Sequence, residues 1–265
     1  MTTALLMILG FVAGLVGAIA GIGGGIIITP ILALNFGIPI REAIGTSLVA
    51  VITTSAASSS VHLQRHTTDI RLGMTLELAT SIGAATTAYL VGYMNRSVLE
   101  LLFALFLLYG AISLLRGKGR GEDDEGPMLR DAAVEIPPYT PRRYGPGLAA
   151  SLVAGGLSGM LGIGGGPVKV PVMYLLMDVP MMVATATSNF MIGVTAAASA
   201  IVYFRRGDIL PSVAAPLCVG VFIGSLIGAK VAPRIHSRYI AYILVVIMLY
   251  LSGHMLFHIF VSPHL

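Results

Sequence analysis

Long apolar stretches with few charged residues run through most of this 265-residue chain. Charged residues make up 11% of the chain, against about 25% in an ordinary soluble domain. A helix of about 20 apolar residues spans the hydrocarbon core of a bilayer. The pattern therefore predicts an all-α polytopic membrane protein. Its apolar segments lie at 3–20, 24–36, 43–62, 72–93, 98–115, 147–161, 165–177, 183–204, 210–231 and 238–261.

The charged residues gather in one place. Between residues 116 and 143 there are six basic and six acidic residues, interspersed with glycine and proline. Such a composition does not build a packed core. We interpret 117–146 as a cytoplasmic linker between a first transmembrane repeat, 1–116, and a second, 147–265. The net charge of +4 fits the positive-inside bias of cytoplasmic loops, and no nucleic-acid surface is inferred from it.

One glycine-rich phrase occurs twice. The stretch "GIGGGIIITP" fills residues 21–30 and "GIGGGPVKVP" fills 162–171, a shift of 141 positions. The same shift aligns Thr46 and Ser47 with Thr187 and Ser188. Because it matches more than glycines, we interpret it as an internal duplication of residues 3–115 and 147–261, an architecture typical of secondary transporters.

The short apolar segment after each glycine phrase is too short to span a bilayer alone. In one geometry each broken pair of helices returns to the side it came from, which gives five segments per half and an inverted repeat. In the other, each pair counts as one interrupted crossing, which gives four spans per half and a parallel repeat. The commoner transporter design favours the inverted repeat.

The glycine phrases are candidate anion-binding elements. Non-helical backbone survives at membrane depth only beside protein or a wet cavity, and a helix start offers free N–H groups to an anion. The competing interpretation is close packing of small residues between helices. The candidate backbone donors are Gly21, Gly23, Gly24, Gly25, Gly162, Gly164, Gly165 and Gly166.

Hydroxyl side chains form two matching stripes on apolar segments. Ser47, Thr54 and Ser58 are spaced to share one helix face, and the duplication repeats that spacing. Such stripes offer hydrogen bonds to an oxyanion, although serine and threonine also bond to carbonyls of their own helix. The substrate-binding candidates are Thr46, Ser47, Thr187, Ser188 and Asn189, and the pathway candidates are Thr54, Ser58, Thr195 and Ser199.

Two charged residues fall inside apolar segments. Lys169 lies within the second glycine phrase, where the first has Ile28. A lysine at membrane depth is a functional candidate by default, here as the counter-charge for an anion. Snorkelling to an interface or pairing with a carboxylate are its alternatives. Glu77 is a candidate proton carrier, or the partner of Lys169.

Few features of the sequence support a disulfide, a metal site, a cofactor or an enzyme. The single cysteine, Cys218, excludes an internal disulfide. No metal, cofactor or Ser-His-Asp arrangement is predicted. An intramembrane enzyme would need Glu77 together with a histidine, which is the weakest reading.

Duplicated "GIGGG…P" blocks, each followed by "P…A…TS", resemble the sulfite exporter TauE/SafE family, also called the 4-toluene sulfonate uptake permeases. The resemblance covers both halves, outside the linker. It implies an inner-membrane, multi-pass transporter of sulfur-containing anions such as sulfite, sulfonates, sulfoacetate or thiosulfate, driven by the proton-motive force. Lys169 lies outside the core glycine motif, so the resemblance assigns it no role.

The sequence therefore predicts a secondary transporter that moves a small oxyanion by alternating access. An anion channel, or a transporter of a non-sulfur anion, is the alternative. The expected partners are the anionic substrate and the lipid bilayer, and a monomer and a homodimer both stay open.

Overall fold

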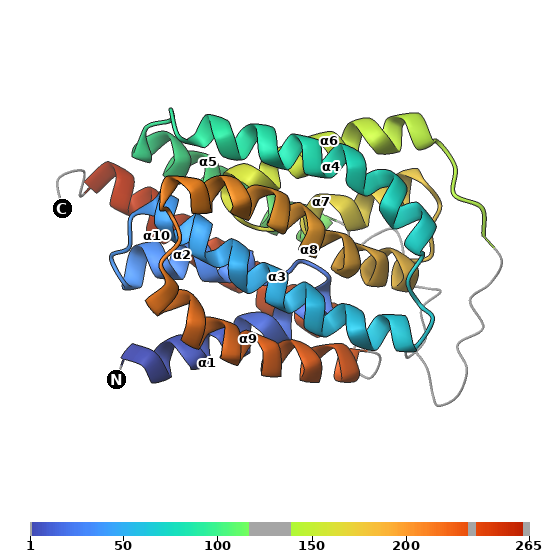
Figure 1. Cartoon of the computed structure of the whole chain (residues 1–265), viewed down its shortest axis with the longest axis horizontal. Helices are drawn as coiled ribbons and strands as arrows, with labels where there is room; N and C mark the ends of the chain where they lie inside the picture. The colour runs from blue at the N-terminus through green and yellow to red at the C-terminus, as the bar shows by residue number, and fades with distance from the viewer. Residues whose placement is uncertain (1, 117–138, 233–236, 262–265) are drawn as a thin grey trace.

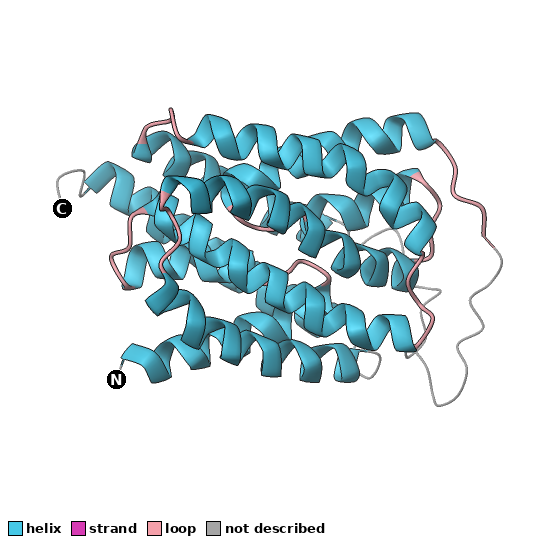
Figure 2. Cartoon of the chain, in the orientation of Figure 1, coloured by secondary structure: helices cyan, strands magenta, loops and turns pink. Residues whose placement is uncertain are grey.

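The computed structural model describes residues 2–116, 139–232 and 237–261. In these ranges every regular element is a helix (Figure 2). Each predicted apolar segment coincides with a helical stretch to within three residues at either end, which confirms the all-α prediction. The elements are α1 (Thr2–Ala20), α2 (Gly25–Asn35), α3 (Ile40–Gln64), α4 (Ile70–Val91), α5 (Arg96–Arg116), α6 (Tyr144–Leu161), α7 (Gly166–Pro171), the π-helix η2 (Val172–Leu176), α8 (Met181–Arg206), α9 (Pro211–Val231) and α10 (Ser237–Val261).

The helices suit a membrane in length and in surface. Five stretches in the described part are long and apolar enough to cross a bilayer: Thr2–Ala20, Ile40–Gln64, Arg96–Ser113, Met181–Arg206 and Pro211–Val231. Large apolar side chains also point outward, with Leu78 and Phe204 each 71% exposed. Outward apolar side chains at this density are typical of a lipid-facing surface. The chain is therefore a multi-pass membrane protein.

The helices lie roughly along the long axis of the molecule (Figure 1). We call the end where α1 begins and α10 ends the terminal end, and the end where α6 begins the linker end. α3 and α8 pack against each other at the centre. On one side α9 packs against both α3 and α1, and on the other α4 packs against both α8 and α6. α5 packs against α10.

Both glycine phrases are breaks in the middle of the bundle. After the first, α2 turns back toward the terminal end, and after the second, α7 and η2 turn back toward the linker end (Figure 1). Each broken pair thus returns to the end from which it came. Residues 21–24 and 162–165 form the connecting loops, which we call the two glycine loops.

Backbone conformation explains three of the glycines in each phrase. Gly21, Gly23 and Gly24 have φ angles of 71°, 78° and 73°, and the glycines 141 positions later have 70°, 79° and 79°. Only glycine adopts this left-handed region without strain. These residues end one helix and allow the next to begin in the opposite direction.

The fourth glycine of each phrase is set by close packing. A Cβ atom on Gly25 would lie 2.2 Å from the carbonyl oxygen of Gly162, and one on Gly166 would lie 2.4 Å from that of Gly21. The two glycine loops therefore touch each other through backbone atoms. In this conformation the close-packing interpretation of these glycines holds, and the contact leaves no room for a side chain between the loops.

We predict that Gly25→Ala destabilises the protein, because the added methyl group overlaps the Gly162 carbonyl oxygen. Overpacking of this kind costs about 1–3 kcal/mol. The melting temperature in detergent should fall. The control is Gly253→Ala in α10, where an added Cβ meets no atom within 4 Å and where alanine is the better helix former. An unchanged melting temperature for Gly25→Ala would show that the two loops are not in contact.

Candidate functional site

Lys169 of the second repeat and Glu77 of the first meet inside the bundle. The Lys169 Nζ lies 3.2 Å from Glu77 Oε2, and their side chains are only 1% and 4% exposed. Thr195 bridges them, since its hydroxyl accepts a hydrogen bond from Lys169 at 2.5 Å and donates one to Glu77 Oε1 at 2.6 Å. A buried ion pair survives when hydrogen bonds satisfy its remaining polar atoms. This three-residue cluster is the candidate site.

Three helices deliver the cluster. Lys169 comes from α7, Glu77 from α4 and Thr195 from α8, and α8 packs against both of the others. The Ser81 hydroxyl also donates to Glu77 Oε1, at 2.9 Å. Thr80 lies beside Thr195, with their hydroxyl oxygens 3.4 Å apart. Sequence reasoning missed Thr80 and Ser81, although they follow Glu77 by three and four residues, the spacing of neighbours on a helix face.

The positions related to this cluster by the duplication carry no such pair. A shift of 141 places Ile28 opposite Lys169 and Cys218 opposite Glu77. Ile28 is fully buried and Cys218 is partly buried. Thr54, the equivalent of Thr195, donates to the carbonyl of Ala50 in its own helix. The charged cluster therefore combines Glu77 of the first half with Lys169 and Thr195 of the second, and the related site, formed by Ile28, Thr54 and Cys218, carries no charge.

The predicted serines adjoin the glycine loops. Ser47 donates to the carbonyl oxygen of Gly162 at 3.2 Å, and Ser188 donates to that of Gly21 at 3.1 Å. Each serine comes from one half and contacts the loop of the other. Thr29 in turn donates to Ser47 Oγ, at 2.7 Å. These hydroxyls stabilise the loops in this conformation by satisfying carbonyls that the helix breaks leave free.

The predicted threonines next to these serines cap helices. Thr46 Oγ1 accepts a hydrogen bond from the N–H of Leu210, just before α9. Thr187 Oγ1 accepts one from the N–H of Asp69, just before α4. The two contacts are again related by the shift of 141. In this conformation both threonines are occupied with neighbouring backbone.

The predicted pathway hydroxyls divide in two. Ser58 and Ser199 are fully buried and donate to carbonyls four residues earlier in their own helices, as Thr54 does. Only Thr195 reaches a charged partner. The hydroxyls at the same spacing along α3 and α8 thus make different hydrogen bonds, because the residues packed next to them differ.

Asn189 lies apart from the charged cluster. Its side-chain N–H₂ donates to the carbonyl of Ala18 at 3.1 Å and lies 3.4 Å from His62 Nε2, while its buried Oδ1 has no hydrogen-bond partner. This places Asn189 against the end of α1, beside the first glycine loop. Sequence reasoning missed His62, which is 8% exposed.

A further pair of contacts related by the shift of 141 was not predicted. Arg65 donates to the carbonyls of Ala229 and Lys230 near the end of α9, and Arg206 donates to those of Ala88 and Tyr89 near the end of α4. A cation at a helix C-terminus is favourable because of the helix dipole. The shift of 141 aligns Arg65 with Arg206, and this alignment was the signal available in the sequence.

An apolar plug separates the charged cluster from the linker end. It contains Leu72, Leu76, Val170, Met173, Met177, Val179, Val183, Ala184 and Met191, with Tyr139 packed against it. Tyr139 donates to Asp69 Oδ2 at 2.6 Å, while Asp69 Oδ1 caps the N-terminus of α4. Burial, and then the hydrogen bond to Asp69, raise the pKa of the Tyr139 phenol.

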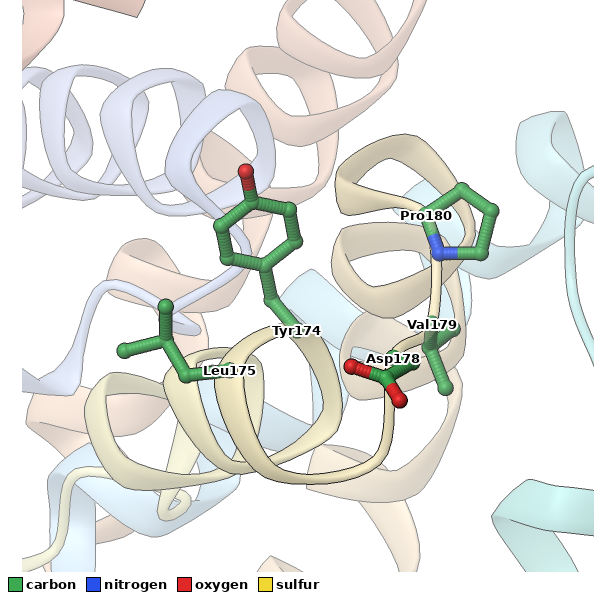
Figure 3. A pocket seen from close by; sticks show the side chains of 5 residues that line it. All are labelled: Tyr174, Leu175, Asp178, Val179 and Pro180. Carbon is green, nitrogen blue, oxygen red and sulfur yellow. The ribbon is translucent and has the colours of Figure 1, made fainter. Parts of the chain in front are cut away.

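Two hollows lie on the outer side of this plug. One, of about 440 Å³, is lined by Tyr174, Leu175, Asp178, Val179 and Pro180 (Figure 3). The other, of about 480 Å³, is lined by Asp69, Arg71, Leu72, Thr75, Pro141 and Tyr144. Val179 and Leu72 belong both to the plug and to these hollows. The plug is thus the layer between the linker-end surface and the charged cluster.

Comparison with known proteins agrees with this architecture. The sequence profile named "Sulfite exporter TauE/SafE" matches residues 6–255. This chain belongs to that family. A Bacillus subtilis relative, named "Probable membrane transporter protein YunE", is 30% identical over 270 residues, covering 97% of this chain and 98% of the relative. A Methanocaldococcus jannaschii relative, also named as a membrane transporter, is 26% identical over 251 residues, covering 89% of this chain and 88% of its own. No solved structure gives a significant match.

Family membership makes the protein a membrane transporter of the TauE/SafE type. This confirms the resemblance seen in the glycine phrases and the expectation of a transporter, not an enzyme. The first helix of the second repeat, α6, begins at Tyr144, so the last three residues of the predicted linker are helical. Residues 117–138 of the predicted linker lie outside the described residues.

We predict that Glu77→Leu lowers stability strongly, because it leaves the buried Lys169 ammonium without its carboxylate. Removing one member of a buried pair costs about 3–5 kcal/mol, whereas replacing both by apolar residues is often neutral. The double variant Glu77→Leu/Lys169→Met should therefore recover most of the lost melting temperature. Equal losses in the single and double variants would contradict a buried ion pair.

Proposed function

We propose that the protein is a secondary transporter of small sulfur-containing oxyanions, such as sulfite or a sulfonate, across the cytoplasmic membrane. The observation that carries this proposal is the buried lysine of the Lys169–Glu77–Thr195 cluster. An oxyanion needs a fixed positive charge and hydrogen-bond donors in place of its water. Lys169 supplies the charge, and Thr195, Thr80 and Ser81 supply hydroxyl groups around it.

Alternating access follows from an inverted repeat, which the course of the helices supports. α1 and α6 run in opposite directions along the bundle, as do α3 and α8 (Figure 1). Their contacts are reciprocal as well, since α1 packs on α9 and α6 packs on α4. Two halves of opposite orientation can exchange conformations, so that a central site opens first to one side of the membrane and then to the other.

The glycine loops have a part in this cycle. Here they contact each other through backbone, so a substrate between them requires the loops to separate. Separation exposes the N–H groups before Ile27 at the start of α2, because the first backbone bonds of this helix come from Ile27 and Ile28 to Gly24. Such N–H groups favour an anion. The conformation described here is then the closed one.

Glu77 is the proposed proton carrier that couples transport to the proton-motive force. In the closed conformation its carboxylate holds Lys169. A proton on Glu77 weakens that hold and frees the ammonium for an anion. Proton binding and anion binding therefore favour each other, which is the condition for coupled transport.

We predict that Lys169→Met abolishes uptake of labelled sulfite into proteoliposomes, because the substrate loses its counter-charge, and that the more stable double variant Glu77→Leu/Lys169→Met is equally inactive. The matched control is Lys230→Ala, which removes an exposed lysine near the end of α9 and should keep normal uptake. Normal uptake by Lys169→Met would exclude Lys169 from the transport site.

A screen of the same vesicles separates this function from its alternatives. Sulfite, methanesulfonate, sulfate and acetate are offered under an inward proton gradient, with and without an uncoupler. Accumulation above the outside concentration that collapses with the uncoupler identifies a coupled transporter, whereas a channel only equilibrates its ion. Accumulation of acetate without any sulfur anion would contradict the proposed substrate class.

A further inference from the structure

The charged cluster is electrically balanced, and this limits the charge of its substrate. Among the described residues, the buried charged side chains are Lys169, Glu77 and Glu100. Glu100 pairs with the half-exposed Arg96 in the first turn of α5, away from the cluster. The closed site therefore holds one positive and one negative charge, with no net charge. A net charge enclosed in the low-dielectric interior is strongly unfavourable.

Few other titratable or charged groups lie near Glu77 to change the net charge of the site. α4 packs against α6 and α8. The only titratable residue of α6 is Tyr144, at its first position. Those of α8 lie at its C-terminal end and are Tyr203, Arg205 and Arg206. α7 contributes Lys169 alone, and on α4 itself Arg71 is exposed. Lys169 is thus the charge that faces Glu77.

We infer that the site carries a monovalent oxyanion together with one proton, as an electroneutral pair. The inference rests on the proposed function, and it adds the charge of the substrate and the ratio of proton to anion. With Glu77 protonated, Lys169 contributes one positive charge, which one monoanion neutralises. A dianion leaves one negative charge uncompensated, as does a monoanion bound beside an ionised Glu77.

The proton balance of one cycle is simple. A proton from water binds a Glu77 carboxylate oxygen, and the Lys169 N–H that bonded to this carboxylate turns to an oxygen of the anion. The Thr195 hydroxyl rotates to accept the single O–H of the protonated carboxyl, while the Ser81 hydroxyl continues to donate to the carboxyl. On the other side the anion leaves, Glu77 releases its proton to water, and the ion pair re-forms.

The positions related to the cluster by the shift of 141 explain why only one anion is carried. They hold Ile28 and Cys218, neither of which can neutralise an anion. Two matched charged sites would allow two anions or a dianion to be neutralised. With one charged site, both the empty and the loaded carrier have no net buried charge, so neither moves charge across the membrane.

The membrane potential tests this directly in wild-type proteoliposomes. Labelled sulfite at acidic pH, where it is mostly the monoanion, is offered under a fixed proton gradient while potassium and valinomycin set the potential. We expect initial rates that change less than about twofold between positive and negative potentials of ~60 mV. Accumulation should approach about tenfold per unit of pH gradient. Rates or accumulation that follow the potential would overturn the inference while leaving sulfite transport in place.

Competition tests the charge of the substrate. Methanesulfonate and sulfate have similar tetrahedral shapes and differ by a methyl group in place of a charged oxygen. Methanesulfonate should inhibit sulfite uptake at a concentration roughly 100-fold or more below that of sulfate. Equal inhibition by methanesulfonate and sulfate would overturn the inference that the substrate is a monoanion. Absence of any sulfite flux in wild type would instead contradict the proposed function.

A matched pair of variants tests Glu77 itself. In Glu77→Gln the residue is always neutral, so the empty carrier is positive and the loaded carrier neutral. Accumulation should then lose its dependence on the pH gradient and change about tenfold for each ~60 mV of potential. Glu100→Gln, which removes the other buried carboxylate, should keep the wild-type behaviour. If Glu77→Gln does not fold, the wild-type measurements still decide the stoichiometry.

Discussion

The contact between the two glycine loops is the constraint on which the rest of the structure depends. A break in a membrane helix leaves N–H and C=O groups without partners, and lipid offers none. Here each loop uses the other half of the protein. Ser188 bonds to the Gly21 carbonyl, Ser47 bonds to the Gly162 carbonyl, and the loops touch where only glycine fits. Neither break is satisfied by its own half alone, so the two halves have to fold together.

Contacts that recur at a shift of 141 build the frame, whereas the buried ion pair does not recur. The threonine caps, the serine bonds and the arginine contacts at helix ends all occur twice. The Lys169–Glu77 pair occurs once, opposite Ile28 and Cys218. Because a frame shared by both halves already holds the loops and helix ends, an ion pair present at only one of the two related sites is not needed for the fold. It is retained at an energetic cost, which favours a functional role.

Sequence alone predicted the helices and both breaks, because apolar length and glycine content are local properties. It also singled out Lys169 and Glu77, since charges are conspicuous in apolar segments. It offered their pairing as one of two alternatives but could not decide between them, because 92 residues separate Lys169 from Glu77 and tertiary packing sets how α4 and α7 face each other. The same limit applies to Thr46 and Thr187. They are predicted to bind substrate, and in this conformation they accept hydrogen bonds from the N–H groups of Leu210 and Asp69, which are 164 and 118 residues away.

The segment that carries Lys169 is less regular than its equivalent in the first half. α7 has only six residues, with prolines at its second and last positions, and it continues as a π-helix. Proline provides no N–H, so hydrogen bonds between turns are missing here. The equivalent α2 stays α-helical for 11 residues despite Pro30. π-Helical turns are frequent at functional sites, where a small rearrangement is needed. Met173 of η2 and Met177 after it belong to the plug, so one short segment carries both Lys169 and part of the linker-end barrier.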